Sequence, residues 1–333
     1  MNIFLFLVFA LIFISQLGAQ EIARFRLMTF NILQGGGNAK HVGFGNELFG
    51  GSRLDEIVSA IKLARADIVG IQEDCSSKSN VILNALGDGW YRAGKSYSKF
   101  PAKLIHSNKD RSLEVVDIEL SDSRVVRIVN CHWWPNNYGP FLAQEKLKAD
   151  PQVDLNSLAK IVQEKGARRG GTRGYKATIK PLEEAIKEKK AIFLVGDFNE
   201  PSHLDWTEHY AKNGLDRWVD NPTGTPLLFP VQWPGSVLLE NIGMVDSFRQ
   251  AHPDEVKKPG NTWTPPYSTL TSGRRPYEEQ VLDRIDRVYH YGEKLDVVSA
   301  KVVGEKGNNS DVVINGKWPS DHRAVVVEYR WKN

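Results

Sequence analysis

Hydrophobic and polar positions alternate along the 333-residue chain with two different periods. Residues 191–195 are apolar without a break and end at Gly196, which is typical of a buried strand. Residues 54–63 instead carry apolar side chains at helical spacing with charged residues between them, which is typical of an amphipathic helix. Segments of both kinds are intermixed along the chain. The pattern therefore predicts an α/β protein with mixed sheets rather than a purely parallel array.

The same periodicities predict further elements over most of the chain. Strands are expected at 24–33, 67–73, 113–120, 124–129, 191–195, 281–291, 311–314 and 324–329, with one or two more between 91 and 106. Helices are expected at 54–63, 80–86, 153–162, 177–190, 206–218 and 237–252, and loops at 221–235 and 259–276. No repeat or linker divides the chain, which favours one domain over residues 21–333.

The N-terminus differs from the rest of the chain. Residues 3–14 form an uninterrupted apolar run, and small residues follow up to Ala19. This run is too short to span a bilayer as a helix and is typical of a secretory signal peptide, although no Lys or Arg precedes it. A buried N-terminal helix is the alternative. We expect a signal peptide over residues 1–20, a secreted mature protein (extracellular or periplasmic) without a transmembrane helix, and a monomer.

Charge and cysteine content constrain the function only weakly. The chain has 43 Lys and Arg against 40 Asp and Glu, a net charge of +3, which neither requires nor excludes a polyanionic partner. Cys75 and Cys131 are the two cysteines. In an exported protein they form either a disulfide or two free thiols, and the sequence favours neither.

Polar side chains lie at or beside the ends of six predicted strands. These clusters are Asn31, Glu73, His132, Asp197 with Asn199, Asp286, and Asp321 with His322. Each cluster alone has an ordinary structural explanation, such as an Asx turn, a hydrogen-bonded histidine or an aspartate paired with a neighbouring arginine. Strand ends that open into loops are, however, where rigid scaffolds place reactive groups. Together the six clusters predict an active site.

The oxygen-rich part of this set is suited to a hard cation. Carboxylate and amide oxygens favour Mg²⁺, Mn²⁺ or Ca²⁺, and magnesium commonly uses one or two protein carboxylates and leaves other positions to water and phosphate. Glu73 and Asp321, with Asn31 beside them, are the candidate metal site. We therefore expect Mg²⁺ or Mn²⁺, with Ca²⁺ as an alternative, and one or two ions.

The remaining members suit phosphate chemistry. His322 would lie near a metal-bound phosphate, and Asp286 would fix its tautomer and favour its charged form. Asp197 and Asn199 are two residues apart and would lie on the same side of an extended chain. One of them would align or deprotonate a water molecule, and the other would donate a hydrogen bond to the phosphate.

These residues carry a family resemblance. Thr29-Phe30-Asn31, Ile71-Gln72-Glu73, Asn130-Cys131-His132, Gly196-Asp197-Phe198-Asn199, Arg284-Ile285-Asp286 and Ser320-Asp321-His322 occur in this order. The chain resembles the endonuclease/exonuclease/phosphatase superfamily, which includes deoxyribonuclease I, exonuclease III and neutral sphingomyelinases, over residues 24–330. The resemblance implies a four-layer α/β/β/α sandwich of two packed mixed β-sheets (deoxyribonuclease I-like) and hydrolysis of a phosphate ester by in-line attack of water.

The resemblance also implies a role for each matched residue. Glu73 matches the metal-binding glutamate, with Asn31 and Asp321 around the same ion. Asp197 matches the aspartate that orients or activates water, and Asn199 matches the asparagine that contacts phosphate. His322 matches the histidine that stabilises the transition-state charge, with Asp286 as its partner. His132 matches a second histidine, whose own carboxylate partner the sequence does not identify.

The substrate is less well defined than the reaction. Trp133 and four other loop tryptophans either stack on a substrate or anchor loops in the core. Arg169 lies in a basic loop that either contacts phosphates or is solvated, and with Trp133 and Asn199 it is a candidate for substrate binding. We favour a phosphodiesterase or nuclease; a lipid phosphodiesterase of the sphingomyelinase type, a phosphomonoesterase and a non-catalytic binding protein are the alternatives. The substrate would be nucleic acid, a small phosphodiester or a phospholipid head group, and residues 200–206 would shape its pocket.

Overall fold

The computed structural model describes residues 24–37, 51–75, 80–108, 113–121, 124–168, 174–267 and 275–332, so the predicted signal peptide lies outside the described residues. The strands form two mixed sheets. The first contains, in spatial order, β12 (Val312–Val313), β11 (Leu295–Gly304), β13 (Ala324–Trp331), β1 (Arg24–Asn31), β2 (Ile68–Gln72), β4 (Ser96–Ser98) and β3 (Tyr91–Ala93). The second contains β5 (Ala102–Ser107), β6 (Leu113–Ser121), β7 (Arg124–His132), β8 (Ala191–Asp197), β10 (Asp286–Tyr291) and β9 (Val245–Asp246).

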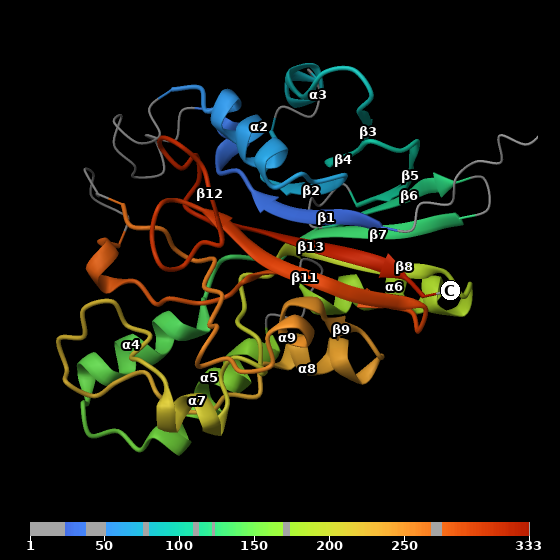
Figure 1. The fold of residues 1–333 in the computed structure, drawn as a ribbon. Coiled ribbons are helices and arrows are strands. Elements are labelled where there is room, and N and C mark those ends of the chain that lie inside the picture. The colour runs from blue at the N-terminus through green and yellow to red at the C-terminus, as the bar shows by residue number, and fades with distance from the viewer. Residues whose placement is uncertain are drawn as a thin grey trace, which may run out of the picture.

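The two sheets are stacked, with helices on both outer sides (Figure 1). Helices α2 (Leu54–Leu63) and α3 (Val81–Leu86) cover the first sheet, and α6 (Tyr175–Lys187), α8 (Pro234–Asn241) and α9 (Ser247–Ala251) lie beside the second. Helices α4 (Gly139–Ala149), α5 (Leu155–Arg168) and α7 (Glu208–Asn213) gather at one end of the molecule. The 3₁₀ turns η1 (Gln34–Gly36) and η3 (Tyr277–Glu279) complete the described elements. This is the predicted four-layer sandwich.

The period of two along each strand determines which side chains face the other sheet. On β1, Phe25 and Leu27 pack in the core between the sheets, whereas Met28 and Phe30 pack in a second core against α2. Full burial of a large apolar side chain contributes about 1.5–3 kcal/mol, so a register slip that exchanged these faces would be costly. Asn31 continues the row that faces the second sheet. The same alternation that builds the core therefore directs Asn31 into the space between the sheets.

Several predicted elements differ from the structure. The helix expected at 237–252 is wrong, because the chain breaks at Gly243 into α8, the short strand β9 and α9. Gly243 has a φ of 85°, a left-handed conformation that a continuous helix excludes. The helix expected at 206–218 is confined to α7. Three short strands, β3, β4 and β5, occupy the region where one or two were expected.

Two elements lacked a clear sequence signal. Helix α4 is weakly amphipathic, and β11 carries exposed and half-buried residues along much of its length, so neither has a strong period. Strand β11 lies between the last two expected strands, so β12 and β13 do not pair with each other: each of them pairs with β11. None of the helices in the described ranges combines the length and the apolar character needed to cross a bilayer.

Candidate active site

Three of the predicted site residues lie in one row across three neighbouring strands. Asp197 ends β8, His132 ends the parallel strand β7, and Asp286 begins the antiparallel strand β10. His132 and Asp286 are both directly opposite Asp197 in the strand registers. Val195 and Val288, the next residues on the same face, pack in the core between the sheets. Because opposite residues point to the same face, all three polar side chains project toward the first sheet.

Asp197 contacts site residues from both sheets. Its Oδ2 accepts a hydrogen bond of 2.9 Å from Asn31 Nδ2 and lies 3.3 Å from His132 Nε2 and 3.7 Å from His322 Nε2. Its Oδ1 accepts a hydrogen bond of 2.9 Å from the backbone N–H of Asn199. Burial favours the neutral carboxyl, but the charge of His322 and the contact with His132 outweigh burial and lower the pKa of Asp197. The buried Asp197 is therefore an ionised carboxylate at neutral pH.

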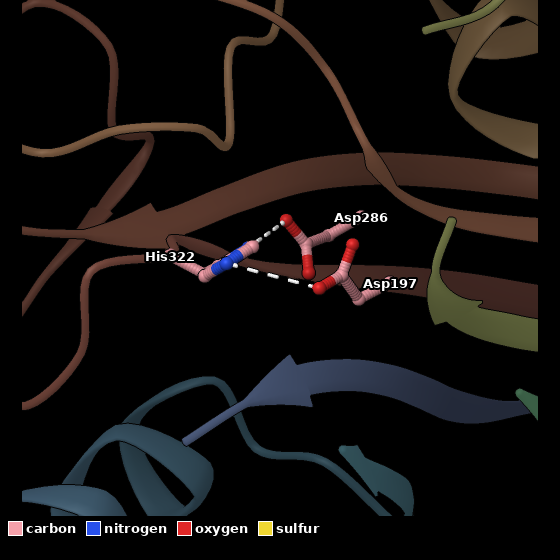
Figure 2. Close-up of side chains that lie close together, drawn as sticks. All are labelled: Asp197, Asp286 and His322. Carbon is pink, nitrogen blue, oxygen red and sulfur yellow. Dashed lines mark hydrogen bonds and ion pairs between the residues drawn. The ribbon is translucent and has the colours of Figure 1, made fainter. Parts of the chain in front are cut away.

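His322 contacts two neighbouring carboxylates, as Figure 2 shows. Its Nδ1 is 2.9 Å from Asp286 Oδ2, and its Nε2 is 3.7 Å from Asp197 Oδ2. Burial disfavours the charged ring, but Asp286, Asp197 and Asp321 outweigh burial and raise the pKa of His322 to about 10. The ring of Trp263 packs at 4.8 Å from the imidazole. The two carboxylates thus fix the imidazole in one orientation and favour its protonated form.

Asp286 is the buried partner of this imidazole. Burial raises the pKa of the Asp286 carboxyl, while the charge of His322 acts in the opposite direction. The negative charge of Asp197, close to both groups, favours a proton on the ring of His322. One ligand atom from each of Asp197, Asp286 and His322 lies within 4.8 Å of the others, a spacing that a cation could also occupy. The direct contacts of both ring nitrogens with carboxylates instead favour the imidazolium.

The predicted metal site lies on the first sheet, opposite this row. Asn31 Nδ2 donates a hydrogen bond of 3.2 Å to Glu73 Oε1, in addition to its bond with Asp197. The backbone carbonyl of Asn31 accepts a bond of 2.6 Å from Ser320 Oγ, next to Asp321. Carboxylates suit a divalent cation, so Glu73 and Asp321 would hold the ion. Asn31 turns its Nδ2 toward Glu73, while its Oδ1 accepts a hydrogen bond from the backbone N–H of Leu33, so Asn31 orients Glu73. A bound cation there would supply positive charge to a phosphate oxygen.

Arg53 is a site residue that the sequence analysis missed. It precedes α2, is buried, and donates hydrogen bonds to the carbonyls of Ile32, Leu33 and Gly37 after β1 and of Pro319 before Asp321. Burial lowers the pKa of Arg53, while Asp321 and Glu73 raise it, so its charge faces both acids. One side chain therefore joins the loop that follows Asn31 to the loop that precedes Asp321, and these are the two metal-site loops. An arginine at the start of an amphipathic helix gives no sequence signal that distinguishes it from a solvated one.

Asn199 lies beside Asp197, but for a different reason from the one predicted. Its φ is 47°, so the chain is not extended there. Asn199 Nδ2 donates hydrogen bonds to Asp197 Oδ2 at 3.2 Å and to the carbonyl of Trp133 at 3.0 Å. A tight turn after β8, rather than strand geometry, brings the two side chains together.

The prediction that Trp133 contacts substrate is wrong for its side chain. The Trp133 indole is 3% exposed, packs on Phe198 and donates a hydrogen bond to Thr178, so it is a loop anchor in the core. The neighbouring Trp134 is 38% exposed. Arg169, the other predicted substrate contact, lies outside the described residues. Cys75 is exposed and Cys131 is buried, and they do not form a disulfide with each other.

Residues 200–206, which are expected to shape the pocket, join the site to the outer helices. Glu200 accepts a hydrogen bond from the backbone of Gly235 at the start of α8. Asp205 is buried and contacts Arg249 of α9 at 2.6 Å and Arg284 at 2.9 Å. Arg284 is therefore not a partner of Asp286. This loop fastens the chain that follows Asp197 and Asn199 to the helical layer.

Comparison with known proteins identifies the family. A family model described as the Endonuclease/Exonuclease/phosphatase family matches residues 28–322. The chain belongs to this family. An uncharacterized protein of Caenorhabditis elegans is 28% identical over 323 residues, which cover 91% of this chain and 90% of the relative.

Solved structures share the fold at low sequence identity. An endonuclease/exonuclease/phosphatase from Beutenbergia cavernae is 16% identical and has a TM-score of 0.51. The match covers 94% of this chain and 72% of the Beutenbergia chain. Truncated TDP2 of Caenorhabditis elegans is 15% identical over 92% of this chain and 97% of its own, with a TM-score of 0.48. The first likeness confirms the deoxyribonuclease I-like fold. Members of the family are metal-dependent phosphoester hydrolases, and this chain is an enzyme of that class.

Proposed function

We propose that the protein is a secreted, magnesium- or manganese-dependent phosphodiesterase or nuclease. The observation that carries this proposal is the single row His132, Asp197 and Asp286, to which Asn31 and His322 are joined from the first sheet. An ionised aspartate beside a charged imidazole suits attack by water on a phosphate that becomes more negative in the transition state.

Each side chain has a proposed task within this geometry. Asp197, with its carboxylate fixed by Asn31 and its pKa lowered, orients the attacking water by accepting a hydrogen bond from it. His322 and His132 lie on the same carboxylate and stabilise the charge on the phosphate oxygens. Asn199 contacts the phosphate by exchanging one of its two Nδ2 hydrogen bonds, which here go to Asp197 and to the carbonyl of Trp133, for a bond to a phosphate oxygen. Positioning and charge stabilisation of this kind account for most catalysis of phosphoryl transfer.

Metal dependence follows from the donor set of Glu73 and Asp321. Hard oxygen ligands with a single nearby amide favour Mg²⁺ or Mn²⁺ over softer ions. Chelation with EDTA should therefore abolish activity, and Mg²⁺ or Mn²⁺ should restore it. Secretion is proposed from the apolar N-terminal segment alone, and detection of a mature N-terminus near residue 20 in the culture medium would test it.

A panel of phosphoesters with and without EDTA tests the proposed reaction. Bis-p-nitrophenyl phosphate, p-nitrophenyl phosphate, plasmid DNA and sphingomyelin separate diesterase, monoesterase, nuclease and lipid phosphodiesterase activities. His322→Ala and Asp197→Ala should lower turnover by about 10³-fold or more while the circular dichroism spectrum is unchanged. His209→Ala is the matched control, because this histidine is exposed on α7. A wild-type enzyme that hydrolyses none of the panel with either metal would replace this proposal with a binding function.

A further inference from the structure

The segment Thr262–Thr264 lies between the two parts of the chain that carry Asp286 and His322. Its middle residue, Trp263, forms an isolated antiparallel bridge to each of them, opposite Asp283 on one side and opposite His322 on the other. The backbone of Trp263 exchanges two hydrogen bonds of 2.9 Å with Asp283, one in each direction. This segment is part of the predicted loop at 259–276 and has no task in the proposed reaction.

Two threonines fasten the segment on either side of the tryptophan. Thr262 Oγ1 accepts hydrogen bonds from the backbone N–H groups of Ile285 at 3.1 Å and of Asp286 at 3.0 Å. Thr264 Oγ1 donates a hydrogen bond of 2.8 Å to the carbonyl of Asp321. Both threonine side chains are fully buried. The backbone between them is therefore fixed relative to the site histidine and to its aspartate partner.

The indole of Trp263 is fixed as well and packs on the imidazole of His322. Its Nε1 donates a hydrogen bond of 3.2 Å to Oε1 of the buried Gln280, whose Nε2 donates one of 2.6 Å to Tyr267 Oη. The ring centroids of Trp263 and His322 are 4.8 Å apart, and the ring planes are inclined at 58°. Aromatic rings at this separation attract each other, and an indole also attracts a positive charge.

The polar contacts of His322 leave one motion of its ring open. Asp286 lies at Nδ1 and Asp197 at Nε2, so the two carboxylates set the direction of the two nitrogens. Contacts at both nitrogens do not set the tilt of the ring plane about the line that joins them. A rigid ring packed against the imidazole does set this tilt. The tilt matters for catalysis, because a displacement of about 1 Å can lower a rate about 100-fold.

We propose that Trp263 is a positioning residue for His322: its indole holds the imidazole in the tilt at which it faces the phosphate oxygens in the transition state. This inference rests on the proposed phosphodiesterase function. Because the indole is half-buried, a stacking contact with the substrate is the competing interpretation. The two differ in their kinetic effect. A residue that acts only through His322 in the transition state changes kcat, whereas a residue that stacks on the substrate changes KM.

Steady-state kinetics with bis-p-nitrophenyl phosphate test the proposal. Trp263→Leu should lower kcat about tenfold, the size of a desolvated contact between a cation and an indole, and leave KM unchanged. Trp263→Phe keeps an aromatic face and should restore most of kcat. Trp90→Leu is the matched control, because Trp90 is also half-buried and has the ammonium of Lys99 5.6 Å from its ring centroid, but it packs in the core against α2. Circular dichroism and urea unfolding report whether each variant is folded.

A double-mutant cycle tests whether Trp263 acts through His322. In the His322→Ala background, measured in single turnover, Trp263→Leu should have almost no further effect, because the group that the indole positions is absent. A further loss of about tenfold in that background would overturn the proposal, since Trp263 would then act independently of His322. A rise in KM with kcat unchanged would also overturn it, in favour of a contact with the substrate.

The NMR resonance of the His322 Cε1–H group separates this inference from the proposed function. The ring current of the indole should displace this resonance, which is identified by its loss in His322→Ala, and Trp263→Leu should remove the displacement. An unchanged resonance would overturn the contact itself. An active enzyme whose kcat is unchanged in Trp263→Leu would overturn the positioning role and leave the proposed function standing. A wild type that is inactive on every ester would contradict the proposed function, and the role of Trp263 in turnover with it.

Discussion

A buried histidine makes the free energy of unfolding depend on pH. His290 lies on β10, 3% exposed, with its Nδ1 2.9 Å from Ser247 Oγ and its ring 5.5 Å from that of Tyr329. Burial lowers the pKa of His290 from 6.5 to about 4, with Asp246 raising it and Lys332 lowering it further. The folded protein therefore holds His290 neutral, and the unfolded chain binds the proton more readily.

The direction of the effect follows from this difference. The contribution of neutral His290 to the free energy of unfolding is fully present above pH 6.5 and is lost as the pH falls toward 4. Two pKa values of 6.5 and about 4 imply a loss of about 1.4 kcal/mol at pH 5.5, rising to about 3 kcal/mol below pH 4. His290→Asn keeps a polar atom near the position of Nδ1 and removes the titration, at the cost of some packing.

Urea unfolding at pH 7.5 and pH 5.5 measures this term. Between these two pH values the wild type should lose about 1.4 kcal/mol more of its free energy of unfolding than His290→Asn does. The other titrating groups are the same in both proteins, so their effect drops out of this difference. His106→Asn, at an exposed histidine of β5, is the matched control. Equal losses in the wild type and in His290→Asn would refute the assignment of a depressed pKa to His290.

Three further substitutions test the site and its supports. Arg53→Lys keeps the charge but loses most of the hydrogen bonds to the two metal-site loops. The Mg²⁺ concentration that gives half-maximal activity should therefore rise about tenfold. An unchanged concentration would show that Arg53 only fills space. Asp205→Asn leaves two buried guanidinium groups undercompensated and should lower the free energy of unfolding by about 3 kcal/mol, measured in urea. In Gly196→Ala the added Cβ would lie 2.3 Å from the carbonyl oxygen of Cys131, so a loss of about 1–3 kcal/mol is expected, and a neutral result would contradict the close strand contact.

The sequence by itself indicated most of the polar residues that meet at the site. Apolar runs that end in polar side chains identify strand ends, and Asn31, Asp197 and Asp286 were found because the alternation of a strand is a local property. The identity of the donors also indicates the chemistry, since carboxylates with an amide favour a hard cation wherever they meet. Both deductions need only neighbouring residues in the chain.

Tertiary structure decided how these residues meet. The alignment of His132 with Asp197 and Asp286 depends on the registers of β7, β8 and β10, and no local pattern encodes a register between strands that lie dozens of residues apart. The burial of Trp133 depends in the same way on what packs over it. The periodicity of hydrophobic residues indicates whether a residue faces a core or lies in a loop, but it does not indicate which residue it contacts there.

Arg53 illustrates the same limit at the metal site. Its neighbours in the chain predict a helix, whereas its function arises from carbonyls near Leu33 and Pro319, which only the pairing of β1 with β13 brings together. The polar strand ends are therefore a property of the sequence. Their assembly into one charged, hydrogen-bonded site is a property of the packing of two sheets, because that packing joins residues from both ends of the chain.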